Sequence, residues 1–257
     1  MTDKLLIDTR PDGLTVLCIN RPEAHNALDL ATMAALADAI DELSGDPSRR
    51  AVILTGAGTE AFCSGADLLE FSRYTSAEDA RMMIGLMGEA LLALERLPIP
   101  VIGAINGYAL GGGSEIALAC DLRFADENVR MGFVQARLGV TPGWGAGQRL
   151  LRVVGYGRAL DLLLTSRVLH APELLGLGLL NRVVEAGTAL DQAIQYARHI
   201  AAMPPEVVRS MKALLQAGLN HPYEEGLRIE SELFPPLWAG EAHQRAVEAF
   251  LNRERNK

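Results

Sequence analysis

Apolar residues along the chain form two patterns, short continuous runs and longer stretches with helical spacing. The runs are rich in β-branched residues and are bounded by glycine, proline or polar residues, as is typical of strands buried in a parallel sheet. The longer stretches repeat apolar positions as amphipathic helices do. The predicted strands are 14–20, 50–56, 101–105, 122–126, 129–133 and 181–185, and the main predicted helices are 28–46, 81–96 and one opening within 139–150.

Strands separated by helices predict an α/β core built from ββα units. From residue 188 the pattern changes to helices only, at 189–203, 204–219, 223–238 and 241–257. These helices are amphipathic and have no strand partner, so they must pack on the core or on another subunit. We expect an α/β core over 1–187 and a helical region over 188–257.

Composition narrows the class of protein. A chain of 257 residues that is 49% hydrophobic suits one large α/β domain with a helical extension, and its net charge of −8 argues against nucleic-acid binding. The odd cysteine count, without metal spacing, predicts reduced thiols in a cytoplasm and no metal site. No apolar segment approaches the roughly 20 uncharged residues that span a membrane. We therefore expect a soluble cytoplasmic protein.

Two glycine-containing loops, each following a predicted buried strand, carry the strongest chemical signal. They are FCSGADL at 62–68 and GGGSE at 111–115. Glycine lets the backbone approach a ligand closely, and two facing loops can aim two amide N–H groups at one oxygen, forming an oxyanion hole. Taken alone, such glycine clusters are more often plain tight turns. Neither loop has the spacing of a phosphate-binding or dinucleotide-binding motif.

Five segments together closely resemble the enoyl-CoA hydratase/isomerase (crotonase) superfamily over about residues 5–190. The resemblance implies a crotonase-type spiral of ββα units, with the tail as C-terminal trimerisation helices and the protein as a homotrimer or a dimer of trimers. A weaker resemblance, in GVTPGWG and LFPPLWAGEA (233–242), is to the ethylmalonyl-CoA and methylmalonyl-CoA decarboxylase branch. The five segments are RPEAHNAL (21–28), FCSGADL (62–68), NGYALGGGSEIALACDLRFA (106–125), GVTPGWGAGQRL (139–150) and GLGLLNRVV (176–184).

The superfamily resemblance also implies a substrate and the residues that hold it. The substrate is an acyl-CoA thioester, so that coenzyme A enters as part of the substrate and no separate cofactor is expected. Its carbonyl oxygen lies between the backbone N–H groups of Ala66 and Gly112, flanked by Gly65 and Gly111, and the segment around Ala24 follows the CoA. An enolate oxygen is what must be stabilised in such a thioester, and bare amides do this without a metal.

The acidic residues decide which reaction follows. Glu115, beside the amide loop, can act as a general acid or base. The alternative is a purely structural role, in which its charge stabilises the helix dipole. The family's hydratases have a second glutamate seven residues before Pro142, and this chain has Gln135 there. A glutamine side chain forms hydrogen bonds but transfers no proton at neutral pH. The standard two-glutamate hydration is therefore in doubt.

Three reactions remain open, and we lead with the first. It is hydration, or a related lyase reaction, with Glu115 as the sole acid and base. Decarboxylation of a malonyl-type CoA thioester needs no base, and Arg137 would hold the substrate carboxylate unless it is a surface residue. Double-bond isomerisation needs one carboxylate only. A non-catalytic acyl-CoA-binding subunit is a rival from another class.

Four other residues near the motifs have two interpretations each. Trp144 either lines the acyl pocket or serves packing. Asp67 neighbours the substrate and is interpreted as a turn or capping acid, and Arg21 either approaches the anionic end of CoA or has a structural use. Cys63, beside the loop at 62–68, is either a nucleophile or, since no histidine lies near it in sequence, an apolar filler.

Overall fold

The computed structural model describes residues 3–255. The chain divides into two compact units, with the boundary in the sequence between Arg198 and His199. The last described strand ends at Val184, and the chain beyond it forms only helices, beginning with α8 (Ala189–Ala201). The change from strands to helices thus falls near residue 188, whereas the compact units separate later, inside α8.

A six-stranded sheet organises the first unit, in the order β1-β2-β3-β5-β7-β10. Every pair of neighbours is parallel except β1 with β2, which is antiparallel. The strands β3 and β5 are buried along their whole length, as their continuous apolar runs predict. The strands of this sheet are β1 (Leu5–Thr9), β2 (Leu14–Ile19), β3 (Ala51–Gly56), β5 (Val101–Ile105), β7 (Leu122–Asp126) and β10 (Arg182–Val184).

A second, four-stranded sheet has the order β4-β6-β8-β9, with β9 antiparallel to β8. Each of its strands is only three residues long. They are β4 (Ala61–Cys63), β6 (Tyr108–Leu110), β8 (Arg130–Gly132) and β9 (Val168–His170).

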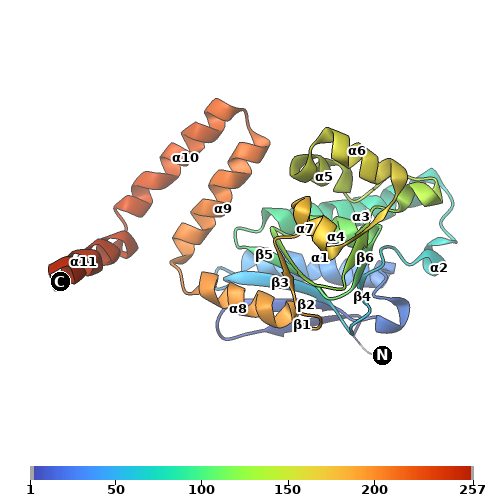
Figure 1. Ribbon diagram of the computed structural model, residues 1–257, viewed down its shortest axis with the longest axis horizontal. Coiled ribbons are helices and arrows are strands. Elements are labelled where there is room, and N and C mark those ends of the chain that lie inside the picture. Colours follow the sequence, from blue (N-terminus) through green and yellow to red (C-terminus); the bar gives the residue numbers. More distant parts are fainter. Residues whose placement is uncertain (1–2, 256–257) are drawn as a thin grey trace. The chain divides into compact units, whose positions relative to one another are not determined.

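From β3 to β8, consecutive strands belong alternately to the larger and the smaller sheet (Figure 1). The pairs β3–β4, β5–β6 and β7–β8 each place their first strand in the larger sheet and their second in the smaller one, and helical segments follow each pair. The predicted core of ββα units is therefore confirmed. The helical segments of the first unit up to β10 are η1 (Pro22–Ala24), α1 (Leu30–Gly45), α2 (Leu68–Phe71), α3 (Ala77–Arg96), α4 (Gly112–Ala119), η2 (Gln135–Leu138), α5 (Ala146–Val154), α6 (Tyr156–Thr165) and α7 (Ala171–Gly176).

Three sequence-based predictions of elements differ from the structure. The loop predicted at 62–68 includes the last two residues of the strand β4 (Ala61–Cys63) and ends at Leu68, the first residue of α2. The predicted strand 129–133 is shorter, and β1 lies in a charged stretch where no strand was predicted. Three-residue strands are too short to show an alternating pattern, and β1 is an edge strand with mostly exposed residues.

The second unit consists of the end of α8 followed by α9 (Pro205–Asn220), α10 (Tyr223–Trp238) and α11 (Glu241–Arg255). Helices α9 and α10 pack against each other, and α10 continues through Pro235 and Pro236. No helix in the described residues is both long and apolar enough for a membrane crossing.

Candidate active site

The loop that carries Ala66 is fixed by pairing with the segment 21–29. Ala66 forms an isolated parallel bridge with Leu28, in which the Leu28 amide donates to Gly65 O at 2.8 Å and the Asp67 amide donates to Leu28 O at 2.9 Å. Peptide groups along an extended chain alternate in direction, so the N–H of Ala66 itself faces away from Leu28. Gly65 makes the required turn with φ of 101°.

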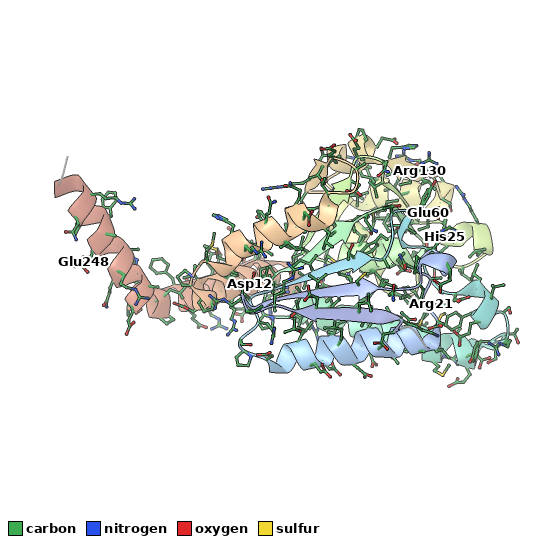
Figure 2. The ribbon with its side chains drawn as sticks, turned by 90° about the horizontal axis from the view of Figure 1, so that it is seen from below. Asp12, Arg21, His25, Glu60, Arg130 and Glu248 are labelled. Carbon is green, nitrogen blue, oxygen red and sulfur yellow. The ribbon has the colours of Figure 1, made fainter. Side chains whose placement is uncertain are left out.

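The segment 21–29 is itself ordered by buried polar contacts. Asn26 has φ of 55°, and its side chain donates to Ala57 O and Ala61 O at 2.9 and 2.7 Å. On the exposed side of the segment, His25 Nδ1 lies 3.5 Å from the Glu60 carboxylate, and Figure 2 labels His25, Glu60 and Arg21 at one end of the strands. These contacts hold η1, with Ala24 at its end, against the first unit.

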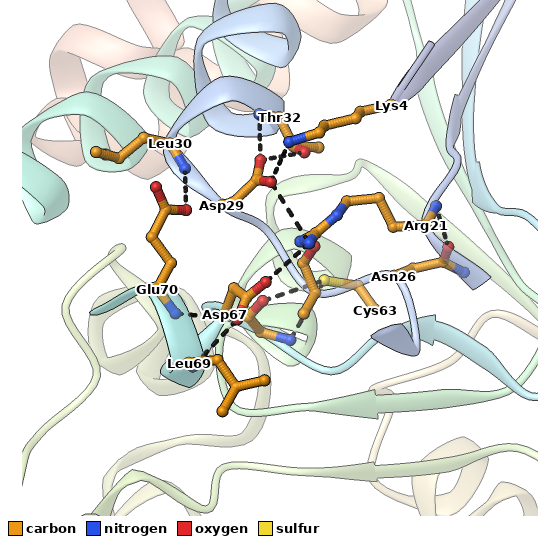
Figure 3. A network of polar contacts seen from close by, with 12 residues as sticks. Lys4, Arg21, Asn26, Asp29, Leu30, Thr32, Cys63, Asp67, Leu69 and Glu70 are labelled. Carbon is orange, nitrogen blue, oxygen red and sulfur yellow. Dashed lines mark hydrogen bonds and ion pairs between the residues drawn. The ribbon is translucent and has the colours of Figure 1, made fainter. Parts of the chain in front are cut away.

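Arg21 and Asp67 form an ion pair that joins this segment to the Ala66 loop (Figure 3). Arg21 Nη2 lies 2.8 Å from Asp67 Oδ2 and 3.4 Å from Asp29 Oδ2, and Asp29 also binds Lys4. Asp67 caps α2 through the amides of Leu69 and Glu70. The structure therefore gives Arg21 a structural use and makes Asp67 a capping acid.

The three glycines at 111–113 are each required by their surroundings. Gly111 precedes α4 with φ of 54° and ψ of −117°, a conformation open to glycine. A Cβ on Gly112 would lie 2.7 Å from Cη2 of the Trp144 ring, and one on Gly113 would lie 2.7 Å from the carbonyl carbon of Cys63. Close approach of β4 and Trp144 thus excludes side chains at this helix start.

The amides of Ala66 and Gly112 lie close to each other and have no hydrogen-bond acceptor among residues 3–255. A Cβ built on Gly65 would be 2.9 Å from the Gly112 nitrogen, so the two loops are in contact here. Within the described residues, neither the Ala66 N–H nor the Gly112 N–H donates a hydrogen bond, whereas Gly111 N–H donates to Gly132 O. Both residues are half-buried. Two N–H groups are thus available at one place.

Glu115, in the first turn of α4, is only 2% exposed. Its Oε1 accepts a hydrogen bond from Gln135 Nε2 at 2.9 Å, and Gly143 N lies 3.4 Å away. Its Oε2 accepts from the amides of Trp144 and Ala146 at 2.8 and 3.0 Å. The carboxylate therefore faces the loop before α5. A glutamate that only stabilised the helix dipole would not need these contacts.

Burial raises the pKa of Glu115 above its ordinary value of 4.5. The hydrogen bonds from Ala146, Trp144, Gln135 and Gly143 stabilise the ionised form and offset only part of this rise. A carboxyl group with a raised pKa takes and returns a proton more readily than an ordinary glutamate.

Gln135 and Trp144 both contact this centre. Gln135, in η2, is 8% exposed, and its Oε1 has no hydrogen-bond partner among the described residues. Trp144 is 4% exposed, and its ring covers Gly112 while its backbone N–H binds Glu115. Trp144 thus connects the acid with one of the two free amides.

Arg149 supports the loop that binds Glu115, a role for which no prediction was made. It is 8% exposed, its Nη1 donates to Trp144 O at 2.8 Å, and its Nε binds Glu95 of α3 at 2.9 Å. The sequence carries one signal of this role, because an arginine at a core-facing position of a helix needs a buried partner.

Arg137 lies apart from the other predicted site residues. Its side chain is directed to the end of α6, where Nη2 donates to Ser166 O at 2.5 Å. Cys63 is fully buried, and this burial raises the pKa of its thiol to about 12, so it is a filler and not a nucleophile. No cluster of three metal-binding side chains occurs in the part of the chain that the structure describes.

Comparison with known proteins places this site in a family. The family model for enoyl-CoA hydratase/isomerase matches residues 9–257. A short-chain-enoyl-CoA hydratase from Clostridium acetobutylicum is 39% identical over 94% of this chain and 92% of its own length. An ethylmalonyl-CoA decarboxylase from Xenopus laevis is 34% identical over 92% of this chain and 79% of its own length.

Solved structures agree with the sequence comparison. The crystal structure of an enoyl-CoA hydratase from Bacillus anthracis is 34% identical, covers 98% of this chain and 97% of its own, and superimposes with a TM-score of 0.92. Both the resemblance seen in the motifs and the crotonase-type fold are confirmed. The chain therefore belongs to the enoyl-CoA hydratase/isomerase (crotonase) family of enzymes.

Proposed function

We propose that this chain adds water to the double bond of an enoyl-CoA thioester, with Glu115 as its sole acid and base. The observation that carries the proposal is the buried Glu115 carboxylate, held by Gln135 and the loop before α5 beside the unpartnered amide of Gly112. Hydration needs a proton acceptor for the water, a proton donor for the α-carbon and charge stabilisation at the thioester oxygen. This centre offers all three.

The amides of Ala66 and Gly112 are the proposed oxyanion donors. When water attacks the β-carbon, the π electrons move towards the thioester oxygen, and two backbone N–H groups there stabilise the enolate. A donor of this kind contributes about 2.7–4 kcal/mol to the transition state. Support comes from the contact between Gly65 and Gly112 and from the finding that neither N–H has a hydrogen-bond acceptor in the described part of the chain.

The remaining substrate contacts follow from the same arrangement. The CoA portion runs along η1 at Ala24, and Gly65, Gly111 and Asp67 shape the loops that present the donors. Trp144 bounds the acyl side, because its ring covers Gly112. Coenzyme A enters as part of the substrate, and the proposed chemistry needs no separate cofactor.

Substitution Glu115→Gln tests the proposal on crotonyl-CoA, with loss of the enoyl-thioester absorbance as the readout. Removing the only proton-transfer group lowers kcat by about 10²–10⁴-fold. The exposed, helix-surface substitution Glu89→Gln in α3 is the control and leaves kcat unchanged. A Glu115→Gln variant with wild-type kcat contradicts the assignment.

Decarboxylation of a malonyl-type thioester is the second candidate, because a decarboxylase is among the relatives. The site weighs against it, since Arg137 is bound to Ser166 O and the buried Glu115 carboxylate repels a substrate carboxylate. Release of CO2 from ethylmalonyl-CoA, insensitive to Glu115→Gln, establishes decarboxylation instead. Movement of the double bond without hydration establishes isomerisation, and turnover of no thioester establishes a binding subunit.

We also propose that the enzyme works as a homotrimer or a dimer of trimers in the cytoplasm, without contact with nucleic acid or membrane. The three cysteines are unpaired, as in a reducing compartment. Apolar side chains exposed on α9, α10 and α11 supply a surface for association, among them Leu215, Leu219, Phe234, Trp238 and Phe250.

A further inference from the structure

The side chain of Arg21 contacts both of the chain segments that meet in the bridge between Leu28 and Ala66. Its Nη1 donates to the carbonyl oxygen of Ala27, the residue before Leu28, at 2.6 Å. Its Nη2 donates to Oδ2 of Asp67, the residue after Ala66, at 2.8 Å (Figure 3). One guanidinium group therefore binds the chain beside Leu28 and the chain beside Ala66 at the same time.

The ion pair between Arg21 and Asp67 is shielded from water, since each partner exposes only 14% of its side chain. Screening is weaker there than at the surface, so this pair contributes more than an exposed pair does. The other carboxylate oxygen of Asp67 accepts from the amides of Leu69 and Glu70, at the start of α2. Asp67 thus ties the chain that follows Ala66 both to α2 and to Arg21.

The direction of the Ala66 N–H depends on the peptide group that it shares with Gly65. In a trans peptide the C=O and the N–H point in opposite directions. Gly65 O accepts from the Leu28 amide at 2.8 Å, and this bond turns the Ala66 N–H away from Leu28. Gly65 has φ of 101°, and glycine leaves the backbone wide conformational freedom. The orientation of the Ala66 N–H is therefore only as well defined as the contact between Leu28 and Gly65.

We infer that Arg21 is a positioning residue for the oxyanion donor Ala66, because it binds Ala27 and Asp67 on the two sides of the bridge. This inference rests on the donor role proposed above for Ala66. Arg21 transfers no proton, and its loss leaves the Ala66 N–H in place with a less favourable direction. Hydrogen bonds weaken steeply as their angle departs from linear, so the charged enolate loses stabilisation, whereas a neutral thioester loses little.

Two CoA thioesters separate the orientation of the donor from general binding. Acetoacetyl-CoA loses an α-proton to give an enolate that absorbs in the near ultraviolet, and the charge on the enolate oxygen is what the donors stabilise. Butyryl-CoA has the same CoA portion and the same chain length but stays neutral in water, so its Kd reports binding alone. A residue that serves only the stability of the fold changes neither quantity in the folded enzyme.

The test substitution is Arg21→Met, which keeps an apolar stem and removes both contacts. We expect the pH at which bound acetoacetyl-CoA ionises to rise by about two units, and kcat for crotonyl-CoA to fall by about 100-fold, as for a group displaced by about 1 Å. The Kd of butyryl-CoA and the KM stay within about threefold of wild type, because ground-state binding is kept. Arg21→Lys keeps the charge without the planar fork, so a smaller rise of about one unit is expected.

Arg49 provides a matched control in the loop between α1 and β3, outside the site. Its Nε lies 2.6 Å from the Asp46 carboxylate, and 18% of its side chain is exposed, which is close to the exposure of Arg21. Arg49→Met therefore breaks an ion pair of similar burial. The ionisation of bound acetoacetyl-CoA and kcat for crotonyl-CoA stay at their wild-type values in this variant.

Three outcomes overturn the inference, and they are read from Arg21→Lys where Arg21→Met does not fold. In the first, the variant ionises bound acetoacetyl-CoA at the wild-type pH. In the second, the Kd of butyryl-CoA rises as much as enolate stabilisation falls, which makes Arg21 a contact of the CoA portion. In the third, the wild type binds acetoacetyl-CoA without forming the enolate, so that Ala66 is no oxyanion donor.

Failure of the proposed hydration gives a different result. In that case bound acetoacetyl-CoA ionises in the wild type and Arg21→Met shifts its ionisation as expected, but the wild type does not hydrate crotonyl-CoA. The positioning role of Arg21 then stands, and the proposed reaction falls.

Discussion

Glu115 combines deep burial with four hydrogen-bond donors, and its ionisation is therefore the property most open to measurement. Because ionised Glu115 is the base, kcat/KM for hydration falls as the pH drops through its pKa, which burial places above 4.5. The pH dependence of kcat/KM for crotonyl-CoA measures this midpoint. A midpoint at or below 4.5 contradicts the role of burial.

The same raised pKa makes stability depend on pH in a defined direction. Folding favours the protonated form of Glu115, so its contribution to stability is present below the unfolded pKa and is lost as the pH rises through the folded pKa. Glu115→Gln carries no such titration. Measured by urea denaturation, the unfolding free energy of the wild type should therefore fall relative to that of Glu115→Gln as the pH rises through this range.

Gly112 and Gly113 differ in what excludes a side chain, and this difference is testable. The methyl group of alanine at 112 clashes with the Trp144 ring, which a smaller side chain can replace. The methyl group of alanine at 113 clashes with the backbone carbonyl of Cys63, which no substitution removes. We expect each single alanine variant to lose stability by the 1–3 kcal/mol typical of overpacking, about 3 kcal/mol for Gly113→Ala. Adding Trp144→Leu restores part of the loss for Gly112→Ala only, as urea midpoints will show. Equal rescue of both variants contradicts this reason.

For single residues, the sequence predicts those that form the site better than those that hold the site residues in place. Glu115 and the glycine loops stand in continuous motifs, so their proximity to one another could be expected. Arg149 also lies in a motif, but its bonds to Trp144 O and to Glu95, far away in the sequence, depend on helix packing. Arg137 sits two residues from Gln135, yet it points to Ser166, because neighbours in a short helix face different sides.

Among the elements, the loop before α5 is anchored to α3 through Arg149. Arg149→Met removes the bonds to Trp144 O and Glu95 but keeps the apolar stem. The ion pair is partly exposed, so we expect a stability loss of about 2–3 kcal/mol, below the 3–5 kcal/mol of a fully buried pair. The freed loop also holds Glu115 less well, so kcat falls more than KM rises.

Arg152 provides a matched control for this prediction. It also pairs with Glu95, but at 3.4 Å and with 39% of its side chain exposed. Exposed pairs contribute about 0–1 kcal/mol, so Arg152→Met should change stability and kcat little. Urea denaturation and steady-state kinetics on both variants compare the two arginines. Equal losses for the two would show that Glu95 alone, and not the bond to Trp144 O, holds the loop.

Elements also differ in how far the sequence predicts them. Long helices such as α1 and fully buried strands such as β3 follow from spacing and capping, since Asp29 caps α1 through the Thr32 amide. The strands of the smaller sheet cannot be predicted in this way, because three residues are too few to show an alternating apolar pattern. Each of these strands also pairs with a segment distant in sequence. The site lies where β4 and β6 lead into helices, so the least predictable strands position it.

For the whole molecule, the helical region poses the clearest question, because its described helices expose many apolar side chains. Leu215, Phe234, Trp238 and Phe250 are each 59–67% exposed. Each large apolar side chain buried on association contributes about 1.5–3 kcal/mol, which favours self-association over a monomer, and we expect the proposed homotrimer or dimer of trimers. Sedimentation equilibrium should therefore give three or six times the chain mass.

Charge substitutions identify the associating surface. Leu215→Glu on α9 places a carboxylate in the proposed contact, so the mass should shift towards that of one chain. The control Gln216→Glu changes the neighbouring residue, which belongs to a different side of the same helix. If Leu215→Glu sediments as the wild type does, α9 lies outside the interface, and if the wild type itself sediments as a monomer, the apolar side chains of this region serve something other than self-association.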